Sequence, residues 1–264
     1  SLHRMTQKTV PDNSFDVIII GAGAAGMFAA GHAASAGARV LLLEKMDRPG
    51  RKLLLTGKGR CNITNTAPLP EFLTHFGKTG RFLRGPFHTY FTDELLDFFH
   101  NHDVPTVTER GGRIFPASSE ARQVADTLEK WAKSLGVRML IHSPVEYLRV
   151  EDGRIVGVKT TRTVPRKGPI YPARTFHAPA VIIATGGKSY PGTGSSGDGY
   201  TLAKGVGHSI EPTRPALVPL VTAGDTARKL MGLSLKNVEA RIWINGKKAG
   251  ADFGEMLFTH LGVS

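Results

Sequence analysis

The sequence predicts an α/β protein built around a Rossmann-like dinucleotide-binding domain. Three observations within residues 16–44 predict this fold. Val17–Ile20 is an uninterrupted β-branched run, typical of a parallel strand that is buried on both faces. The motif Gly21-x-Gly23-x-x-Gly26 follows directly and opens an alanine-rich segment, typical of a helix, that ends at Gly37. A second buried run, Val40–Leu43, ends at Glu44.

Each part of this motif has a physical role in binding a dinucleotide. Gly21 permits the tight turn from strand to helix, Gly23 lets a pyrophosphate approach the backbone, and Gly26 lets the helix pack close to the strand. The unpaired amides at the helix start favour phosphate oxygens. Glu44 stands at the distance expected of an acid that accepts hydrogen bonds from both ribose hydroxyls, which makes NADP the least favoured occupant. The alternative is a glycine-rich turn in an ordinary α/β protein.

Composition limits the possible functions of the chain. Its 264 residues carry a formal net charge of +12, which suits anionic ligands or nucleic acid. The basic residues are scattered along the chain, so we expect a solvated basic surface and no specific nucleic-acid partner. Cys61 is the single cysteine, which excludes an internal disulfide. The N-terminus lacks an apolar signal segment and no apolar run has membrane-spanning length, so we expect a cytoplasmic protein without a membrane partner.

A basic, glycine-rich segment, residues 48–65, follows the nucleotide motif. Its glycines let the backbone approach a ligand and its cations suit a large anionic cofactor, while a flexible basic surface loop is the alternative. Residues 72–102 are helix-like, and the spacing of Leu95, Leu96, Phe98 and Phe99 favours core packing of this segment.

The middle of the chain continues the α/β pattern. Residues 110–116 predict a turn and strand, and Ser118 or Ser119 is the expected cap of a helix over residues 120–135. A strand over residues 137–141 follows, then a small antiparallel meander over residues 145–177 that is inserted between Rossmann elements. Residues 180–184 form another short buried strand, which ends in Thr185-Gly186-Gly187.

The last third of the chain changes in character. Residues 189–200 are rich in glycine, and a helix beginning near Thr201 places Asp198 close to a helix N-terminus. We expect the dinucleotide-binding domain to cover residues 15–215 and a second, largely β domain to begin near Ala216. Asn245-Gly246 predicts a hairpin within that second domain, and the chain ends inside it.

Four segments in this order resemble the BaiN/YhiN-like flavoproteins, within the FAD-binding fold of glutathione-reductase-like and fumarate-reductase-like enzymes. The segments are RPGRKLLLTGKGRCNITN, GGRIFPAS, ATGGKSYPGTGSSGDGY and GEMLFTHLGVS. The resemblance changes the expected cofactor from NAD to FAD. Proteins of this family continue beyond the Gly-Val-Ser of this chain and return to the FAD domain, so we expect the chain to be part of a longer protein.

The resemblance also implies positions for the cofactor. It places the pyrophosphate on the Gly21–Gly26 turn, the ribose on Glu44, the adenine by Val145, and the Gly-Asp-Gly around Asp198 near the flavin. The expected FAD-binding residues are Gly21, Gly23, Ala24, Ala25, Gly26, Glu44, Lys45, Arg51, Lys52, Gly57, Gly59, Arg60, Cys61, Asn62, Val145, Ala184, Thr185, Gly186, Gly187 and Asp198.

We expect an FAD-dependent oxidoreductase that transfers hydride between flavin and either NADH or NADPH or a small organic substrate. A non-catalytic FAD- or NAD-binding protein and a basic RNA-associated protein are the alternatives. His260 is a candidate acid or base, with a structural histidine as the favoured interpretation. Cys61 lacks a second cysteine for a redox couple, so packing is its expected role. The sequence indicates no metal site and leaves the oligomeric state open.

Overall fold

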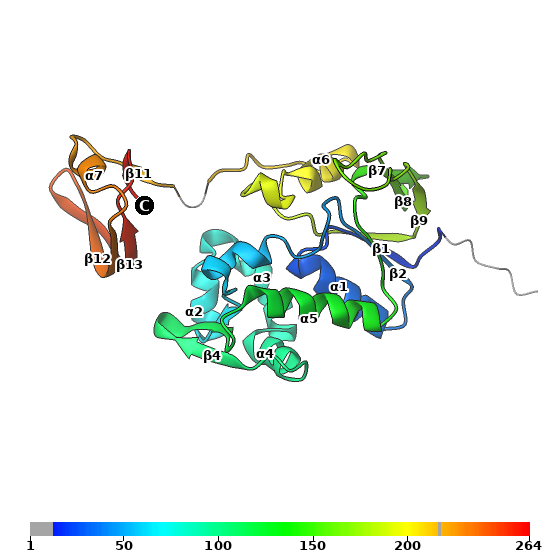
Figure 1. Ribbon diagram of the computed structural model, residues 1–264, viewed down its shortest axis with the longest axis horizontal. Coiled ribbons are helices and arrows are strands. Elements are labelled where there is room, and N and C mark those ends of the chain that lie inside the picture. The colour runs from blue at the N-terminus through cyan, green and yellow to red at the C-terminus, as the bar shows by residue number, and fades with distance from the viewer. Residues whose placement is uncertain (1–12, 216–217) are drawn as a thin grey trace, which may run out of the picture. The chain divides into compact units, whose positions relative to one another are not determined.

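The computed structural model describes residues 13–215 and 218–264. The chain divides into two compact units, one ending at Ile210 and the other covering Glu211–Ser264 (Figure 1). The domain start expected near Ala216 falls on residues 216–217, which lie outside the described residues.

A four-stranded parallel sheet forms the centre of the first unit, and it confirms the predicted Rossmann-like α/β fold. Its strands in spatial order are β10 (Ala180–Ile183), β1 (Val17–Ile20), β2 (Val40–Leu43) and β6 (Arg138–Leu140). Val17 pairs with Val40 on one side and with Ala180 on the other. β1, the first strand of the motif, therefore lies between β10 and β2. Because all four strands are parallel, their carboxyl ends lie at the same edge of the sheet.

The two faces of this sheet are covered by different structures. Helices α1 (Ala24–Ser35) and α5 (Ala121–Ser134) pack on one face, where Ile19 joins their core (Figure 1). Ile18 and Ile20 point to the opposite face, because successive side chains of a strand alternate. Both faces of β1 are therefore buried, which explains why the strand carries no polar residue.

The opposite face carries the predicted antiparallel meander. It consists of β7 (Val145–Glu151), β8 (Arg154–Thr160) and β9 (Thr175–His177), with α6 (Asp198–Gly205) in contact with β7. Asp152 and Gly153 both have positive φ angles, 50° and 72°, as a tight hairpin turn of the type I′ kind requires. Val158 and Phe176 of the meander are buried against the sheet.

The segment between β2 and α5 is made of short elements. They are η1 (Leu53–Gly59), β3 (Thr64–Asn65), α2 (Leu69–Thr74), η2 (Gly77–Thr79), α3 (Gly80–Thr89), α4 (Thr92–His100), β4 (Thr106–Glu109), η3 (Arg110–Gly112) and β5 (Arg113–Pro116). The helix-like stretch is interrupted at Gly77, whose φ angle of 58° is left-handed. Phe98 and Phe99 are buried as expected, whereas Phe82 is 84% exposed and lies outside the core.

The predicted cap of α5 is wrong. The residue at the N-cap is Glu120, and its side chain makes no capping hydrogen bond. Ser118 instead donates its hydroxyl to the Oε1 atom of Gln123 at 2.6 Å. Ser119 has a positive φ angle of 55°, which is incompatible with the extended backbone of an N-cap.

The second unit contains a long hairpin formed by β12 (Ser234–Ile244) and β13 (Lys247–Leu257). The predicted turn at Asn245-Gly246 joins them, with φ angles of 50° and 75°. A short helix and a two-stranded pair complete the unit: α7 (Thr226–Lys229), β11 (Leu220–Val221) and β14 (Gly262–Val263). Within the described ranges of both units, no helix combines the length and apolar character needed to cross a bilayer.

Gly31 sets the spacing between α1 and α5 and generates a test of this packing. A Cβ added at Gly31 would lie 2.1 Å from the Cζ3 atom of Trp131, so Gly31→Ala forces the indole to move. We expect a loss of about 1–3 kcal/mol in the free energy of unfolding, measured by urea denaturation.

The matched control is Gly205→Ala at the end of α6, where an added Cβ meets no atom within 4 Å outside the neighbouring residues. We expect this control to raise the free energy of unfolding by about 0.5–1 kcal/mol, because alanine loses less conformational entropy in a helix. Equal changes in the two variants would contradict the proposed packing role of Gly31.

Candidate functional site

A cavity of about 530 Å³ lies at the carboxyl ends of the parallel strands. Open α/β sheets bind ligands at this edge. Segments far apart in the sequence form its wall, and all of them belong to the first unit. The lining residues are Ile20, Gly21, Ala22, Gly23, Ala24, Ala25, Leu43, Glu44, Lys45, Arg48, Gly50, Arg51, Lys52, Leu53, Thr56, Ser143, Pro144, Val145, Ile183, Ala184, Thr185, Gly186, Thr193, Gly194, Ser195, Asp198 and Leu202.

The glycine turn has the shape that a pyrophosphate requires. Gly21 has a φ angle of 100°, and a Cβ there would lie 2.6 Å from the carbonyl oxygen of Ala184. A Cβ on Gly26 would lie 1.8 Å from the carbonyl oxygen of Gly21, so the helix packs against the turn itself. A Cβ on Gly23 would meet nothing within 4 Å. The space beside Gly23 is therefore open to a ligand.

The N-terminus of α1 opens into the same cavity. Gly23 is the N-cap residue, and no side chain accepts a hydrogen bond from the first turn. Ala24 and Ala25 in that turn line the cavity. The first amides of a helix lack intrahelical partners, so they and the helix dipole favour an anion at this position.

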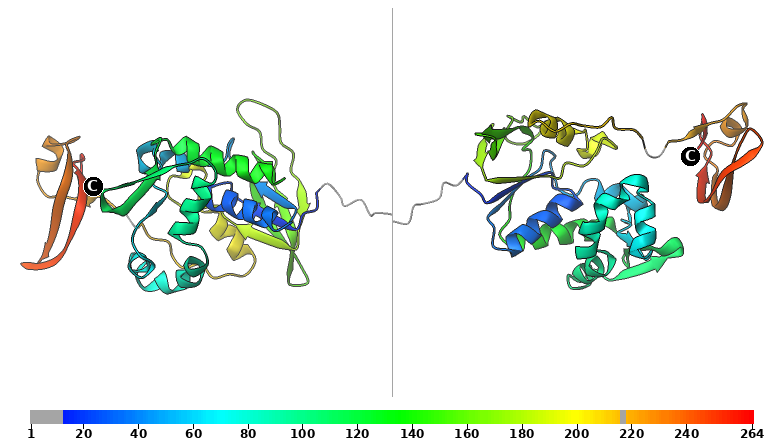
Figure 2. Two further views of the ribbon diagram at one scale, coloured as in Figure 1. Left: turned by 90° about the horizontal axis from the view of Figure 1, so that it is seen from below. Right: turned by 180° about the vertical axis from the view of Figure 1, so that it is seen from behind.

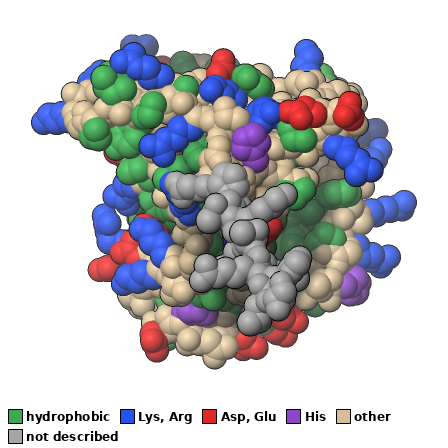
Figure 3. Space-filling view, turned by 90° about the vertical axis from the view of Figure 1, so that its right-hand side faces the viewer, with side chains coloured by type: hydrophobic (Ala, Val, Ile, Leu, Met, Phe, Trp, Pro, Cys, Tyr) green, Lys and Arg blue, Asp and Glu red, His purple; other side chains and the backbone are tan. Residues whose placement is uncertain are grey.

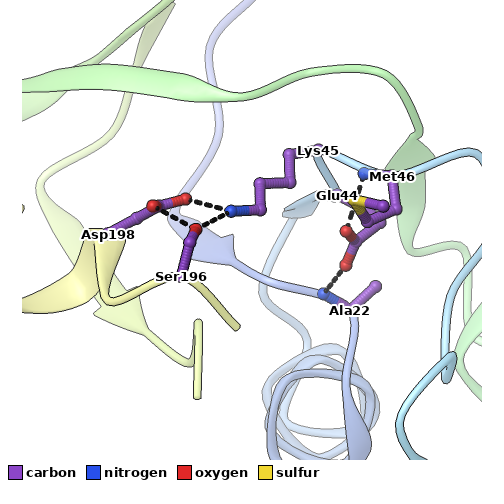
Figure 4. A network of polar contacts seen from close by, with 6 residues as sticks. All are labelled: Ala22, Glu44, Lys45, Met46, Ser196 and Asp198. Atoms are coloured by element: carbon purple, nitrogen blue, oxygen red, sulfur yellow. Dashed lines mark hydrogen bonds and ion pairs between the residues drawn. The ribbon is translucent and has the colours of Figure 1, made fainter. Parts of the chain in front are cut away.

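Glu44 is held in a fixed orientation by two backbone amides (Figure 4). Its Oε2 atom accepts a hydrogen bond from the amide of Ala22, and its Oε1 atom accepts one from the amide of Met46, both at 2.8 Å. Each carboxylate oxygen has a second lone pair, so Glu44 can still accept hydrogen bonds from a ribose diol. The carboxylate therefore also ties the end of β2 to the glycine turn, a role that sequence analysis did not predict.

Lys45 and Asp198 bond to each other across the cavity wall. The Nζ atom of Lys45 donates to Asp198 Oδ2 at 2.6 Å and also to the hydroxyl of Ser196 (Figure 4). Partial burial acts to raise the pKa of Asp198, but hydrogen bonds from Lys45 and Ser196 outweigh it and lower that pKa below its usual value. The carboxylate is therefore the stable form at neutral pH. The pair connects the end of β2 to the start of α6.

The basic loop contributes two of its predicted cations to the cavity. Arg51 lines the cavity and pairs with Asp47 at 2.8 Å. Lys52 also lines it and donates to the carbonyl oxygen of Ser189 at 2.8 Å. This second bond joins the basic loop to the glycine-rich segment that precedes α6, so the two segments border the same cavity.

The predicted cofactor-binding residues between Gly57 and Asn62 do not line this cavity, and several of them make contacts within the protein. Arg60 pairs with Glu109 at 2.7 Å and stacks on the ring of Phe115 at 4.2 Å. Cys61 is buried, and this burial raises the pKa of its thiol. Asn62, with its amide nitrogen turned inward, reaches the carbonyl oxygen of Thr64 at 3.0 Å. Contacts of Gly57, Gly59, Arg60, Cys61 and Asn62 with a cofactor stay predictions.

The remaining predicted residues fall into three groups. Val145, Ala184, Thr185 and Gly186 line the cavity. Gly26 packs against the carbonyl group of Gly21 in the turn, and neither Gly26 nor Gly187 is a lining residue. His260 belongs to the second unit, so its relation to the cavity stays a prediction.

Several lining residues were not predicted as cofactor-binding residues. They are Ile20, Ala22, Leu43, Arg48, Gly50, Leu53, Thr56, Ser143, Pro144, Ile183, Thr193, Gly194, Ser195 and Leu202. The signal for Ser143 and Pro144 was available, since they follow the strand expected over residues 137–141 and so stand at the ligand-binding edge. Arg48 and Gly50 are part of the basic loop itself.

The glycine turn, the fixed acid and the helix N-terminus together define a Rossmann-type dinucleotide-binding domain. The sequence from residue 15 to residue 261 matches the family described as "HI0933-like protein Rossmann domain". The chain therefore belongs to the HI0933-like family of FAD-dependent Rossmann proteins, which confirms the flavoprotein resemblance.

Two relatives with assigned functions are similar over most of this chain. The ribosomal RNA dihydrouridine synthase of Escherichia coli (strain K12) is 33% identical over 251 residues, which cover 95% of this chain and 58% of the relative. The 3-dehydro-bile acid delta(4,6)-reductase of Clostridium scindens is 34% identical over 249 residues, which cover 93% and 57%. The chain thus spans less than two thirds of the length of either relative.

A solved structure shares the fold. The open conformation of a flavocytochrome c3 fumarate reductase aligns with a TM-score of 0.59 at 22% sequence identity. The alignment covers 86% of this chain and 47% of that chain. At this identity the likeness concerns the fold alone.

Two glycine variants separate cofactor contact from packing in the turn. We expect Gly23→Ala to preserve the stability of the cofactor-free protein but to weaken FAD binding, because its methyl group enters only the open space of the cavity. We expect Gly26→Ala to lower the stability of the cofactor-free protein and also to weaken FAD binding, because its methyl group collides with Gly21. Thermal unfolding of the cofactor-free protein and flavin titration measure the two effects, and matching behaviour of the variants would contradict these roles.

A double-mutant cycle tests the ion pair between Lys45 and Asp198. With Lys45→Met and Asp198→Asn, we expect a coupling of about 1 kcal/mol or less at neutral pH, since both side chains are partly exposed. The folded-state pKa of Asp198 is lowered, so the stabilisation is present above the unfolded pKa and is lost as pH falls through the folded pKa. A coupling that stays constant on acidification would contradict the pairing.

Proposed function

We propose that this chain is the FAD domain of a flavin-dependent reductase acting on a carbon–carbon double bond conjugated to a carbonyl group. The observation that carries the proposal is the cavity at the glycine turn, which offers an open phosphate position, a helix N-terminus and a fixed acid. The names of the two relatives support the reaction class. A dihydrouridine is a uridine with a reduced ring double bond, and a delta(4,6)-reductase removes ring double bonds.

The residues of the cavity fit the ADP half of FAD. The open space beside Gly23 accommodates a pyrophosphate, and the amides of Ala24 and Ala25 favour its charge. Glu44 has free lone pairs for the ribose hydroxyls and repels a 2′-phosphate. Bound FAD would supply hydride transfer to or from its isoalloxazine ring. At the ADP half of the cofactor, the role of the protein is to bind and orient the nucleotide.

Charges around the cavity support the binding of a dianionic pyrophosphate. Arg48, Arg51 and Lys52 all lie in its wall, although Asp47 offsets the charge of Arg51 as Asp198 offsets that of Lys45. Arg51 and Lys52 are each held by a partner, so their positions require little further ordering when a ligand binds. Preorganised cations of this kind stabilise an anion more effectively than mobile surface charges do.

We further propose NADH or NADPH as the electron donor, and a cytoplasmic location where these donors are present. The substrate class follows from charge. The formal net charge of +12 favours a polyanion such as RNA over an apolar molecule, and more Lys and Arg than Asp and Glu side chains are visible on the face in Figure 3. We expect attraction to RNA phosphates that is weak and falls steeply with salt, without sequence-selective contacts.

Cofactor analysis and flavin kinetics test the proposed function. We expect the purified protein to carry FAD, not FMN, because Glu44 and the glycine turn bind the ADP moiety that FMN lacks. Anaerobic NADH or NADPH should bleach the flavin absorbance, and a conjugated enone or a uridine-containing RNA should restore it, whereas an isolated alkene should not. Acid-released FMN, or reoxidation by oxygen alone, would contradict the proposal.

A further inference from the structure

A basic hairpin projects from the first unit and has no role in the cavity. It comprises residues 161–174, which connect β8 to β9, and we refer to it as the basic arm. Figure 2 (left) shows this segment of the chain extending away from the sheets. The arm contributes no residue to the lining of the cofactor cavity. Its length and exposure suit contact with a partner outside the protein.

The arm is a built structure with a defined backbone. Thr163 and Tyr171 exchange two backbone hydrogen bonds of 2.8 and 2.9 Å across it. At its base, the amide of Thr160 donates to the carbonyl oxygen of Arg174 at 2.9 Å. Pro165 and Pro169 restrict the backbone near the tip, which lowers the entropy lost when the arm binds a partner.

Four cations lie exposed on the arm. Arg162, Arg166, Lys167 and Arg174 are all exposed, and none of them forms an ion pair with any residue that the structure describes. Residues 161–174 contain no Asp or Glu. These charges are concentrated on one narrow projection that holds no acidic residue. Their mutual repulsion disfavours the free protein and would be relieved by a polyanion.

The base of the arm is attached to the wall of the cofactor cavity. The amide of Thr161 donates to the carbonyl oxygen of Pro144 at 2.9 Å, and Pro144 lines the cavity. The ring of Tyr171 packs on the ring of His142 at 4.7 Å between centroids. Val145, next to Pro144, is expected to meet the adenine of FAD, so the arm stands at the end of the cofactor remote from the flavin. A ligand that contacts both the arm and the flavin must therefore extend along the length of the cofactor.

We propose that the basic arm is a docking element that binds the backbone phosphates of RNA without reading its sequence. The choice of RNA as the polyanion rests on the proposed function. The arm's capacity to bind polyanions rests on its four exposed cations, which make no ion pair with the described residues. Protein contacts with double-stranded RNA are made mainly to phosphates and 2′-hydroxyls, and they recognise shape rather than sequence. The arm is a hairpin, not an amphipathic helix, which disfavours insertion into a membrane surface.

Neutralisation of the arm tests the proposal in the protein loaded with FAD. The arm variant carries Arg162→Gln, Arg166→Gln, Lys167→Gln and Arg174→Gln. The control variant carries Arg122→Gln, Lys130→Gln, Arg154→Gln and Lys204→Gln, four exposed cations away from the arm that make no ion pair among the described residues. Both variants lose the same net charge. FAD content and thermal unfolding should match the unmodified protein in both.

Binding is measured by fluorescence anisotropy with a labelled RNA duplex of about 16 base pairs, over a range of salt concentrations. We expect the arm variant to lose about tenfold in affinity at low salt. The slope of log affinity against log salt should fall by about 3, because each lost phosphate contact removes about 0.7–0.9. The control variant should lose less than about threefold, as expected for a change in net charge alone.

Three results would overturn the proposal. The first is unchanged RNA binding by the arm variant, and the second is an equal loss in the two variants. The third is arm-dependent binding of polyglutamate, or of phosphatidylcholine–phosphatidylglycerol vesicles, that is as tight as binding of RNA. Flavin reduction and reoxidation are measured separately, so failure of the reductase proposal leaves the binding result interpretable.

Discussion

The close approach of α1 to the turn after β1 is the contact on which the cofactor cavity depends. The Gly26 Cα lies so near the carbonyl oxygen of Gly21 that a side chain cannot be accommodated there. This contact directs the first amides of the helix toward the carboxyl edge of the sheet. It also leaves Gly23 at the surface of the turn with open space beside it. The anion position is thus a consequence of packing between a helix and a strand.

Glu44 extends this arrangement to the neighbouring strand. Its carboxylate accepts hydrogen bonds from the amides of Ala22 and Met46, so β2 and the glycine turn are fixed relative to each other before any ligand binds. The next residue, Lys45, pairs with Asp198 at the start of α6. Two adjacent residues on one strand end therefore have different tasks. One presents acceptors to the cavity, and the other joins its opposite walls.

Charge is distributed in the first unit according to function. Three cations in the cavity wall are held by specific partners: Lys45 by Asp198, Arg51 by Asp47, and Lys52 by the carbonyl oxygen of Ser189. Arg60 forms an ion pair with Glu109 and stacks against Phe115. The cations of the basic arm have no such partners among the described residues. Fixed cations suit a resident cofactor, and unpaired exposed cations suit a partner that binds and leaves.

Local features of the sequence determined the α/β class, the glycine turn, the acid at Glu44, the meander and the Asn245-Gly246 hairpin. Each of these depends on residues that are close in the chain, such as alternating apolar runs and turns with positive φ angles. Tertiary structure alone decided the pairing of Lys45 with Asp198, the stacking of Arg60 on Phe115 and the contact of Gly31 with Trp131. The two residues of such a contact are far apart in the sequence. Lys45 and Asp198 are separated by 153 positions, and Arg60 is separated by 49 positions from its ion-pair partner Glu109. No local pattern encodes such a contact, because it forms only when folding brings distant segments of the chain together.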